Sequence, residues 1–301
     1  VFSVEDGNLN SVSVNTARFD VTKHLATPVV SDAKIGLKEL SKALGNWKAP
    51  NVWYERALKE KSQWDQYVEK QSGSTNQELP SYAHAVGAIY RSADSSDIVV
   101  TAAGGLVGEV VQIWKPKELN TFETEWGFSC MGYEISGALG IKMAKPNQDV
   151  IVFVGDGSYL LNNSDIYSSV IYDKKLIIVV CDNGGHMVIN RLQLAKGGKE
   201  YLCNLKATGA KNLQFVDFES HAKSMGANAE TVKSTSELEA AFKRAKTSNK
   251  TYVISIKTHG YEWLDGTAFW ESPTLEVHST EENKKAYDEF LEGKKKQRKG
   301  V

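Results

Sequence analysis

The chain has little cysteine and no long apolar run, and both absences exclude whole classes of protein. Its three cysteines, Cys130, Cys181 and Cys203, lie far apart without metal-ligand spacing, and their odd number argues against a disulfide framework. We therefore expect a reducing, cytoplasmic setting. No apolar run approaches the roughly 20 residues of a membrane span, and the first residues show no signal-peptide pattern. A membrane partner is not expected.

An excess of charge of either sign is also missing. Lys and Arg total 36 against 37 Asp and Glu in 301 residues. No net field favours nucleic acid or an anionic membrane surface, so no nucleic-acid partner is expected. What the chain does have is 41% hydrophobic residues, enough for the cores of one large or two ordinary domains. Any function must come from a local arrangement of residues.

Strand-like and helical patterns alternate along most of the chain. Ser234 and Glu237 form a capping-box signal that opens one of the helices. The predicted strands are rich in β-branched residues and carry no alternation of polar side chains, as is typical of parallel strands buried on both faces. They are Asp97–Ala102, Val150–Val154, Leu176–Cys181 and Tyr252–Lys257. The pattern predicts an α/β fold with a doubly wound, mostly parallel sheet.

The first part of the chain has a pattern of its own. Short strands are expected at Ser11–Val14 and Val29–Val30, and Asp32 is expected to cap a helix that ends at Gly45. We interpret residues 1–46 as the C-terminal remnant of a preceding α/β domain, 47–80 as a linker helix and loop, and 81–301 as the main domain with a polar tail. Because the first residue is Val1, we expect a piece of a longer protein.

Polar or glycine-rich segments follow three of the predicted strands. In open parallel sheets, ligands bind at the carboxyl ends of the strands. Gly104 and Gly105 come just before a helix, where free backbone N–H groups favour a phosphate, although they are equally consistent with close helix–strand packing. The other two segments are Gly155-Asp156-Gly157-Ser158 and Asp182-Asn183-Gly184-Gly185-His186.

The spacing between Asp156 and Asn183 indicates a metal site. They are 183 − 156 = 27 positions apart, which is one crossover of helix and strand. Carboxylate, amide and carbonyl oxygens at adjacent strand ends suit a hard cation such as magnesium. Gly-Asp-Gly alone would indicate only a turn, and the asparagine at this distance favours the metal. His186 follows directly, so it is expected either to contact the bound ligand or to face solvent.

Gly-Asp-Gly, a gap of this length and an asparagine together resemble the motif of the thiamine-diphosphate enzymes. The resemblance implies that Asp156, the Asn183 side chain and the carbonyl of Gly185 hold magnesium against the diphosphate. The segment "WGFSCMGYEISGALG" is similar to the family segment with a bulky apolar residue under the cofactor, and Met131 is the matching position. That residue would force the folded cofactor conformation, although methionine at such a place is also typical of core packing.

The resemblance implies a set of cofactor contacts around these segments. The activating glutamate of the family comes from the pyrimidine-binding domain of a partner subunit, so it is expected outside this chain, in a homodimer or tetramer with shared active sites. This chain alone is therefore expected to be inactive. The residues assigned to the cofactor are Gly104, Gly105, Leu106, Cys130, Met131, Gly155, Asp156, Gly157, Ser158, Asn183, Gly185, His186 and Met187.

Within the acetolactate synthase group, the segments "CDNGGHMVINRLQ" and "FVDFESHAKSMGA" are most similar to the trihydroxycyclohexane-1,2-dione hydrolases. The similarity implies magnesium-dependent and thiamine-diphosphate-dependent ring opening of that cyclic dione to 5-deoxyglucuronate in myo-inositol catabolism. Met187 stands where a glycine is expected, and "THGYEWLDGTAFWESP" follows the family only loosely. The alternatives are another enzyme of the group, such as an acetolactate synthase or a 2-oxo-acid decarboxylase, and a non-catalytic α/β module.

Overall fold

The computed structural model describes residues 11–23, 26–265 and 274–295. Contacts divide the chain into two compact units, Val1–Gln63 with Gly266–Val301, and Trp64–Asp265. These limits differ from the boundaries expected after residues 46 and 80, and the helix α3 (Asn51–Gln71) runs through Gln63 without a break. The interpretation of the first segment as a domain remnant stays a prediction.

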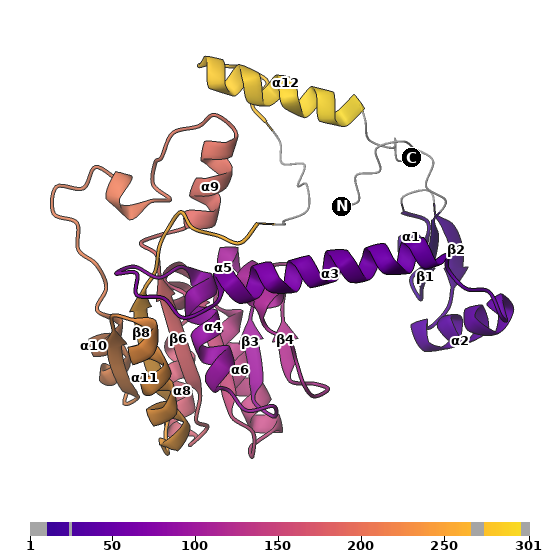
Figure 1. The fold of residues 1–301 in the computed structure, drawn as a ribbon. Helices are drawn as coiled ribbons and strands as arrows, with labels where there is room; N and C mark the ends of the chain where they lie inside the picture. Colours follow the sequence, from indigo (N-terminus) through magenta and orange to yellow (C-terminus); the bar gives the residue numbers. More distant parts are fainter. Residues whose placement is uncertain (1–10, 24–25, 266–273, 296–301) are drawn as a thin grey trace. The chain divides into compact units, whose positions relative to one another are not determined.

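The larger unit is built on one six-stranded sheet in which all paired strands are parallel (Figure 1). The strand order is β4-β3-β5-β6-β8-β7. The strands are β3 (Ile98–Thr101), β4 (Phe122–Thr124), β5 (Val150–Gly155), β6 (Ile177–Asp182), β7 (Asn228–Val232) and β8 (Tyr252–Lys257). The predicted α/β fold with a parallel sheet is therefore confirmed.

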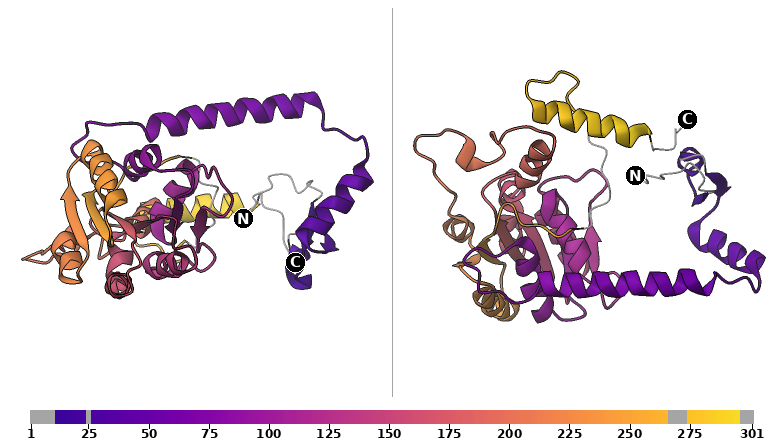
Figure 2. Two further views of the ribbon diagram at one scale, coloured as in Figure 1. Left: turned by 90° about the horizontal axis from the view of Figure 1, so that it is seen from below. Right: turned by 45° about the horizontal axis from the view of Figure 1, so that its top comes forward.

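Helices cover both faces of this sheet, and two views from other directions show the layers (Figure 2). Successive residues of β5 point to opposite faces, so Ile151 and Phe153 join one buried cluster while Val150, Val152 and Val154 join the other. The first cluster includes α4 (Tyr82–Ser92), α5 (Gly104–Ile113) and α11 (Thr235–Thr247). The second includes α6 (Tyr133–Ala144), α8 (Ser164–Ile171) and α10 (Phe218–Ser224).

The four predicted strands lie within one residue of β3, β5, β6 and β8, whereas β4 and β7 were missed. The sequence of β4 is only FET and none of its residues is fully buried. That of β7 is NAETV, half-polar with partial burial. Both lie at the edges of the sheet, where a strand is short and one side lacks a neighbour, so the hydrophobic pattern is weak.

The start of α11 differs in one detail from the predicted capping box. The Glu237 N–H donates to Ser234 Oγ at 3.2 Å, as expected of an N-cap. The Glu237 carboxylate, however, accepts from the N–H of Lys233 at 2.8 Å, one residue before the cap. The inner face of α11 is fully buried and consists of Leu238, Ala241, Phe242 and Ala245.

The smaller unit contains two parallel strands, β1 (Val12–Asn15) and β2 (Thr27–Val30), with α1 (Arg18–Val21) and α2 (Ala33–Leu44). The Asp32 side chain accepts from the N–H groups of Lys34 and Ile35, so the predicted cap of α2 is confirmed. Two apolar positions that keep helical spacing on α2 are exposed, Leu37 at 60% and Leu40 at 45%. A four-residue strand pair offers too little surface to cover them.

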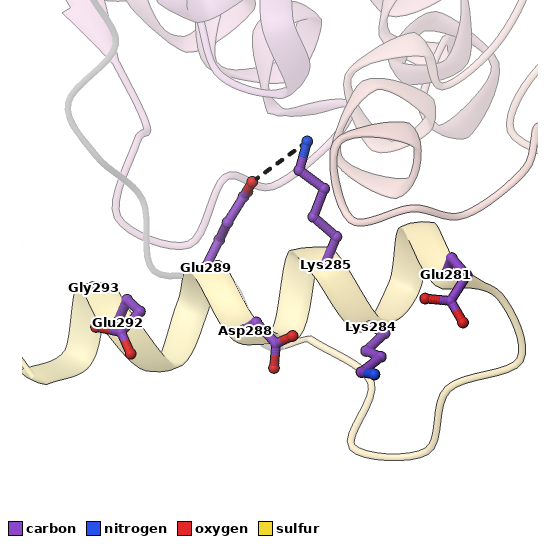
Figure 3. Close-up of a pocket in the computed structure, with 7 residues that line it drawn as sticks. All are labelled: Glu281, Lys284, Lys285, Asp288, Glu289, Glu292 and Gly293. Atoms are coloured by element: carbon purple, nitrogen blue, oxygen red, sulfur yellow. Dashed lines mark ion pairs between the residues drawn. The ribbon is translucent and has the colours of Figure 1, made fainter.

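The helix α12 (Glu281–Lys295) in the polar tail carries mainly charged side chains. A shallow hollow on it is lined by residues of this one helix, and Lys285 lies 3.9 Å from Glu289 one turn further on (Figure 3). Pairs of this kind support an exposed helix. All walls of this hollow come from one helix, which leaves it open to solvent. The other lining residues are Glu281, Lys284, Asp288, Glu292 and Gly293.

A membrane-spanning helix must be both long and apolar. In the part of the chain that the structure describes, no helix combines the length and the apolar character needed to cross a membrane. The helix α3 is long, with 21 residues, but its sequence NVWYERALKEKSQWDQYVEKQ is strongly charged.

Candidate functional site

The site lies where the strand order of the sheet reverses. From β3 the chain goes to β4 on one side, and it then returns to β5 on the other side of β3 before continuing to β6. The chain therefore leaves β3 and β5 toward opposite sides of the sheet, and open α/β sheets bind ligands at such a reversal of strand order. Gly104 follows β3 and Asp156 follows β5 at this point.

Asp156 begins the helix α7 (Asp156–Leu161) and is only 5% exposed. Its Oδ2 accepts a hydrogen bond of 2.7 Å from the N–H of Gly185, so the end of β5 is joined to the loop after β6. Burial and the neighbouring Asp182 carboxylate raise the pKa of Asp156 to about 7. Asp182 accepts from the Gly184 N–H at 3.0 Å and pairs with Lys257, its partner in register on β8.

Asn183 has a buried polar atom at this end of the sheet. Its side-chain oxygen Oδ1 is buried, and among the described residues it has no hydrogen-bond partner. Leaving a buried acceptor unsatisfied costs about 1–3 kcal/mol, so such an atom calls for an explanation. A cation held by this oxygen, the Asp156 carboxylate and the Gly185 carbonyl would supply one. No group of three His, Cys, Asp or Glu side chains in the described ranges could hold a metal.

Gly185 occupies a position that only glycine fits. Its φ is +141°, and a Cβ there would lie 2.3 Å from the carbonyl oxygen of Cys203. The N–H of His186 donates to the same oxygen at 2.8 Å, and the N–H of Leu205 donates to the carbonyl of Gly184 at 3.0 Å. The backbone around the predicted metal-binding carbonyl is therefore fastened to segment 203–205.

A polar network lies behind this segment. The Glu200 carboxylate accepts from Asn190 at 2.9 Å and from Asn204 at 3.3 Å, and Tyr261 donates to it as well. Asn190 is fully buried on α9 (Met187–Ala195). The guanidinium of Arg191 on the same helix lies 4.9 Å from the ring centroid of Trp263. The network joins α9, the segment around Asn204 and the chain after β8.

Three of the predicted cofactor residues converge at the start of α7. A Cβ built on Gly157 would lie 2.6 Å from Cε1 of His186 and 3.4 Å from Cε of Met131. Both side chains therefore lie against Gly157. His186 is exposed, as one of its two expected placements required, and its contact with a ligand stays a prediction. Met131 is half-buried and is not part of either core cluster, which favours a role at the site over core packing.

The glycines after β3 lie in different surroundings. Gly104 has a φ of +77°, and a Cβ there would meet nothing within 4 Å. A Cβ on Gly105 would lie 3.4 Å from Val188 on α9. The absence of a side chain at Gly105 therefore lets α5 pack closely against α9. At Gly104 no neighbouring atom lies on the side where a Cβ would be, so the backbone is accessible to a ligand. The side chain of Leu106 is 2% exposed and belongs to the core.

The remaining predicted residues are placed as follows. Gly155 ends β5, with the Tyr82 hydroxyl 3.8 Å from a Cβ built there, and Ser158 is buried. Met187 is 3% exposed. Cys130 is exposed, and its backbone N–H donates to the Glu125 carboxylate at 2.8 Å. This hydrogen bond is local to the loop between β4 and α6.

Glu134 was missed by the sequence analysis. It is 1% exposed, and its two carboxylate oxygens accept from the N–H of Ala103 at 3.1 Å and from the N–H of Gly132 at 2.8 Å. Burial raises the pKa of Glu134, while these N–H groups and the Ser158 hydroxyl lower it in part. No sequence pattern identifies a buried carboxylate in a glycine-rich helix, because its partners are 31 and 2 positions away.

Comparisons with known proteins identify the family of the chain. The family model "Thiamine pyrophosphate enzyme, C-terminal TPP binding domain" matches residues 102–256. A 3D-(3,5/4)-trihydroxycyclohexane-1,2-dione hydrolase from Halalkalibacterium halodurans is 32% identical over 92% of this chain and 47% of its own length. One of the same name from Lacticaseibacillus casei is 30% identical over 97% and 49%. The chain thus spans about half the length of the curated relatives it matches.

Solved structures show the same fold. A thiamine diphosphate-dependent 4-hydroxybenzoylformate decarboxylase from Rhodococcus jostii superimposes with a TM-score of 0.54 at 17% identity, over 62% of this chain and 34% of that one. A benzoylformate decarboxylase from Polynucleobacter necessarius gives a TM-score of 0.52 at 20% identity over the same shares, 62% and 34%. At these identities the likeness concerns the fold alone.

Proposed function

Because this chain belongs to the thiamine pyrophosphate enzyme family, whose C-terminal cofactor-binding domain it carries, we propose that it forms the magnesium and diphosphate half of a hydrolase active site. The observation that carries the proposal is the buried, unsatisfied Oδ1 of Asn183 in the described part of the chain. It belongs to the loop whose Gly185 N–H is bonded to Asp156 at the reversal of strand order.

The residues fit the cofactor as follows. Asp156, Asn183 and the carbonyl of Gly185 would hold the magnesium ion, and backbone N–H groups at Gly104 and Gly105 would bind diphosphate oxygens at the start of α5. When bound, thiamine diphosphate supplies a nucleophilic carbon and an electron sink. Met131, held against Gly157, would support its ring system. The other predicted contacts are Leu106, Cys130, Gly155, Ser158, His186 and Met187.

We propose hydrolytic ring opening of trihydroxycyclohexane-1,2-dione to 5-deoxyglucuronate, in the cytoplasm and within myo-inositol catabolism, as the reaction. The names of the curated relatives support the substrate. Since the chain spans about half of their length, the activating glutamate is assigned to a pyrimidine-binding domain outside it, in a homodimer or tetramer. This chain alone would then bind cofactor without turnover.

Turnover assays on the whole protein that contains this chain test the substrate. With thiamine diphosphate and magnesium, we expect ring opening of the cyclic dione, no acetolactate or acetaldehyde from pyruvate, and loss of activity in Asp156→Asn. Turnover of pyruvate in place of the dione would assign the protein to the synthase or decarboxylase branch. An inactive protein without affinity for thiamine diphosphate would identify a non-catalytic module.

A further inference from the structure

We propose that Glu134 is a positioning residue, whose buried carboxylate fixes the distance between the turn that carries Met131 and the loop that carries Gly104. The inference rests on the proposed thiamine-diphosphate site. It concerns a residue outside the set assigned to the cofactor and the metal, which acts through the backbone on either side.

The contacts of Glu134 lie directly beside the predicted cofactor residues. Oε1 accepts from the N–H of Ala103, the residue before Gly104, at 3.1 Å. Oε2 accepts from the N–H of Gly132, the residue after Met131, at 2.8 Å. One carboxylate thus joins two residues that are 29 positions apart in the sequence (132 − 103 = 29).

The two segments need this support for different reasons. Gly104 has a φ of +77° and open space on the side where a Cβ would lie, so packing there does not hold the loop. Gly132 has a φ of +97°, and a Cβ there would lie 2.5 Å from Cβ of Asn162, so the turn requires glycine, whose own backbone is the least restricted. Fastening both backbones to one side chain sets their separation before any ligand binds.

A carboxylate is the group that this place requires. The Ala103 and Gly132 partners are N–H donors, the Ser158 hydroxyl is a further partner, and a side chain with two acceptor oxygens can serve all of them. An amide of the same shape accepts one bond and turns its NH₂ group toward the other N–H. At 1% exposure no water compensates for that mismatch. Preorganisation of this kind raises affinity because binding no longer has to order the loop.

The test is the dissociation constant of thiamine diphosphate with magnesium, measured by titration calorimetry on the whole protein that contains this chain. The variants are Glu134→Gln, which keeps the shape, and Glu134→Asp, which keeps the charge but shortens the side chain. Glu123→Gln, at an exposed carboxylate on β4, is the matched control. Each titration is made well below the unfolding temperature of the variant, as checked by circular dichroism.

We expect both Glu134 variants to weaken cofactor binding by about tenfold or more while they remain folded, and Glu123→Gln to bind as the wild type does. If either folded Glu134 variant binds with wild-type affinity and only its unfolding temperature falls, the residue is structural and the inference is overturned. If the wild-type protein shows no affinity, the proposed function fails and this inference falls with it. The two failures are therefore distinct.

Discussion

At the scale of single residues, Glu109 on α5 shows how burial controls a titration. It is 4% exposed, its Oε1 accepts from the N–H of Leu264 at 2.9 Å, and its Oε2 has no hydrogen-bond partner among the described residues. Burial raises the pKa of Glu109 to about 7, although this hydrogen bond and the charge of Arg191 act in the opposite direction. The carboxyl group in the unfolded chain has its ordinary pKa of about 4.3.

This difference predicts a loss of stability with rising pH. Below the pKa of the unfolded chain the Glu109 carboxyl group is protonated in both the folded and the unfolded protein, so it adds no pH dependence to the free energy of unfolding. As the pH rises toward 7 the unfolded state loses its proton first, and the free energy of unfolding falls by an amount on the order of 3 kcal/mol. Glu109→Gln keeps an acceptor for Leu264 and should lack that fall. Urea unfolding at pH 5 and pH 8 measures it, and equal pH dependence in both proteins would contradict the assignment.

The residues of the site differ in how far the sequence predicts them. Asp156 and Asn183 could be paired because each follows a recognisable buried strand, and strand order brings their loops together. Glu134 could not be predicted, since nothing local distinguishes it from a solvent-facing carboxylate on a helix. The pairing of Asp182 with Lys257 depends on the register of β6 and β8, which side-chain patterns alone do not fix when both strands are buried on both faces.

At the scale of elements, the loop after β6 depends on its contact with segment 203–205. The backbone of Gly184 and His186 exchanges hydrogen bonds with Leu205 and Cys203, and Gly185 fits between them without a side chain. The sequence predicted the glycine-rich loop, but segment 203–205 carries no pattern that would place it there. Such contacts between irregular segments are decided by the tertiary structure, so the sequence left them open.

Gly185→Ala tests this contact. The new Cβ would lie 2.3 Å from the Cys203 carbonyl oxygen, at a φ of +141° that alanine rarely adopts. We expect a loss of about 2 kcal/mol or more in the free energy of unfolding and weaker magnesium-dependent cofactor binding. Gly108→Ala on α5, where a Cβ meets nothing within 4 Å, is the control and should be neutral or stabilising by up to about 1 kcal/mol. Denaturant unfolding of both variants compares them, and equal stabilities would contradict the structure.

At the scale of the whole larger unit, a stabilising cluster of ion pairs and the candidate site lie at opposite ends of the sheet. Beside the amino ends of β3 and β5, Lys246 of α11 pairs with Asp97 at 2.6 Å, Asp94 at 2.9 Å and Asp149 at 3.0 Å. Asp97 is 2% exposed on its side chain, so it depends on the lysine for compensation of its charge. The candidate site lies beyond the carboxyl ends of the same strands.

Lys246→Ala should therefore destabilise the protein and spare the site. We expect a loss of about 2–3 kcal/mol in the free energy of unfolding, because three carboxylates lose their shared cation. The affinity for thiamine diphosphate should stay within about twofold of the wild-type value at a temperature where the variant is folded. Lys243→Ala, at an exposed position of the same helix, is the control. Equal stability of the two variants would show that the ion-pair cluster contributes nothing.

The central claim is that Asp156, Asn183 and Gly185 hold a magnesium ion against the diphosphate of the cofactor. Its most direct test is calorimetric titration of thiamine diphosphate into the whole protein that contains this chain, once with magnesium and once with EDTA, and again for Asn183→Ala. The exposed Asn147→Ala serves as the matched control. The account predicts binding that requires magnesium, is lost in Asn183→Ala and is unchanged in Asn147→Ala. Binding that persists in EDTA, or that Asn183→Ala leaves intact, would contradict it.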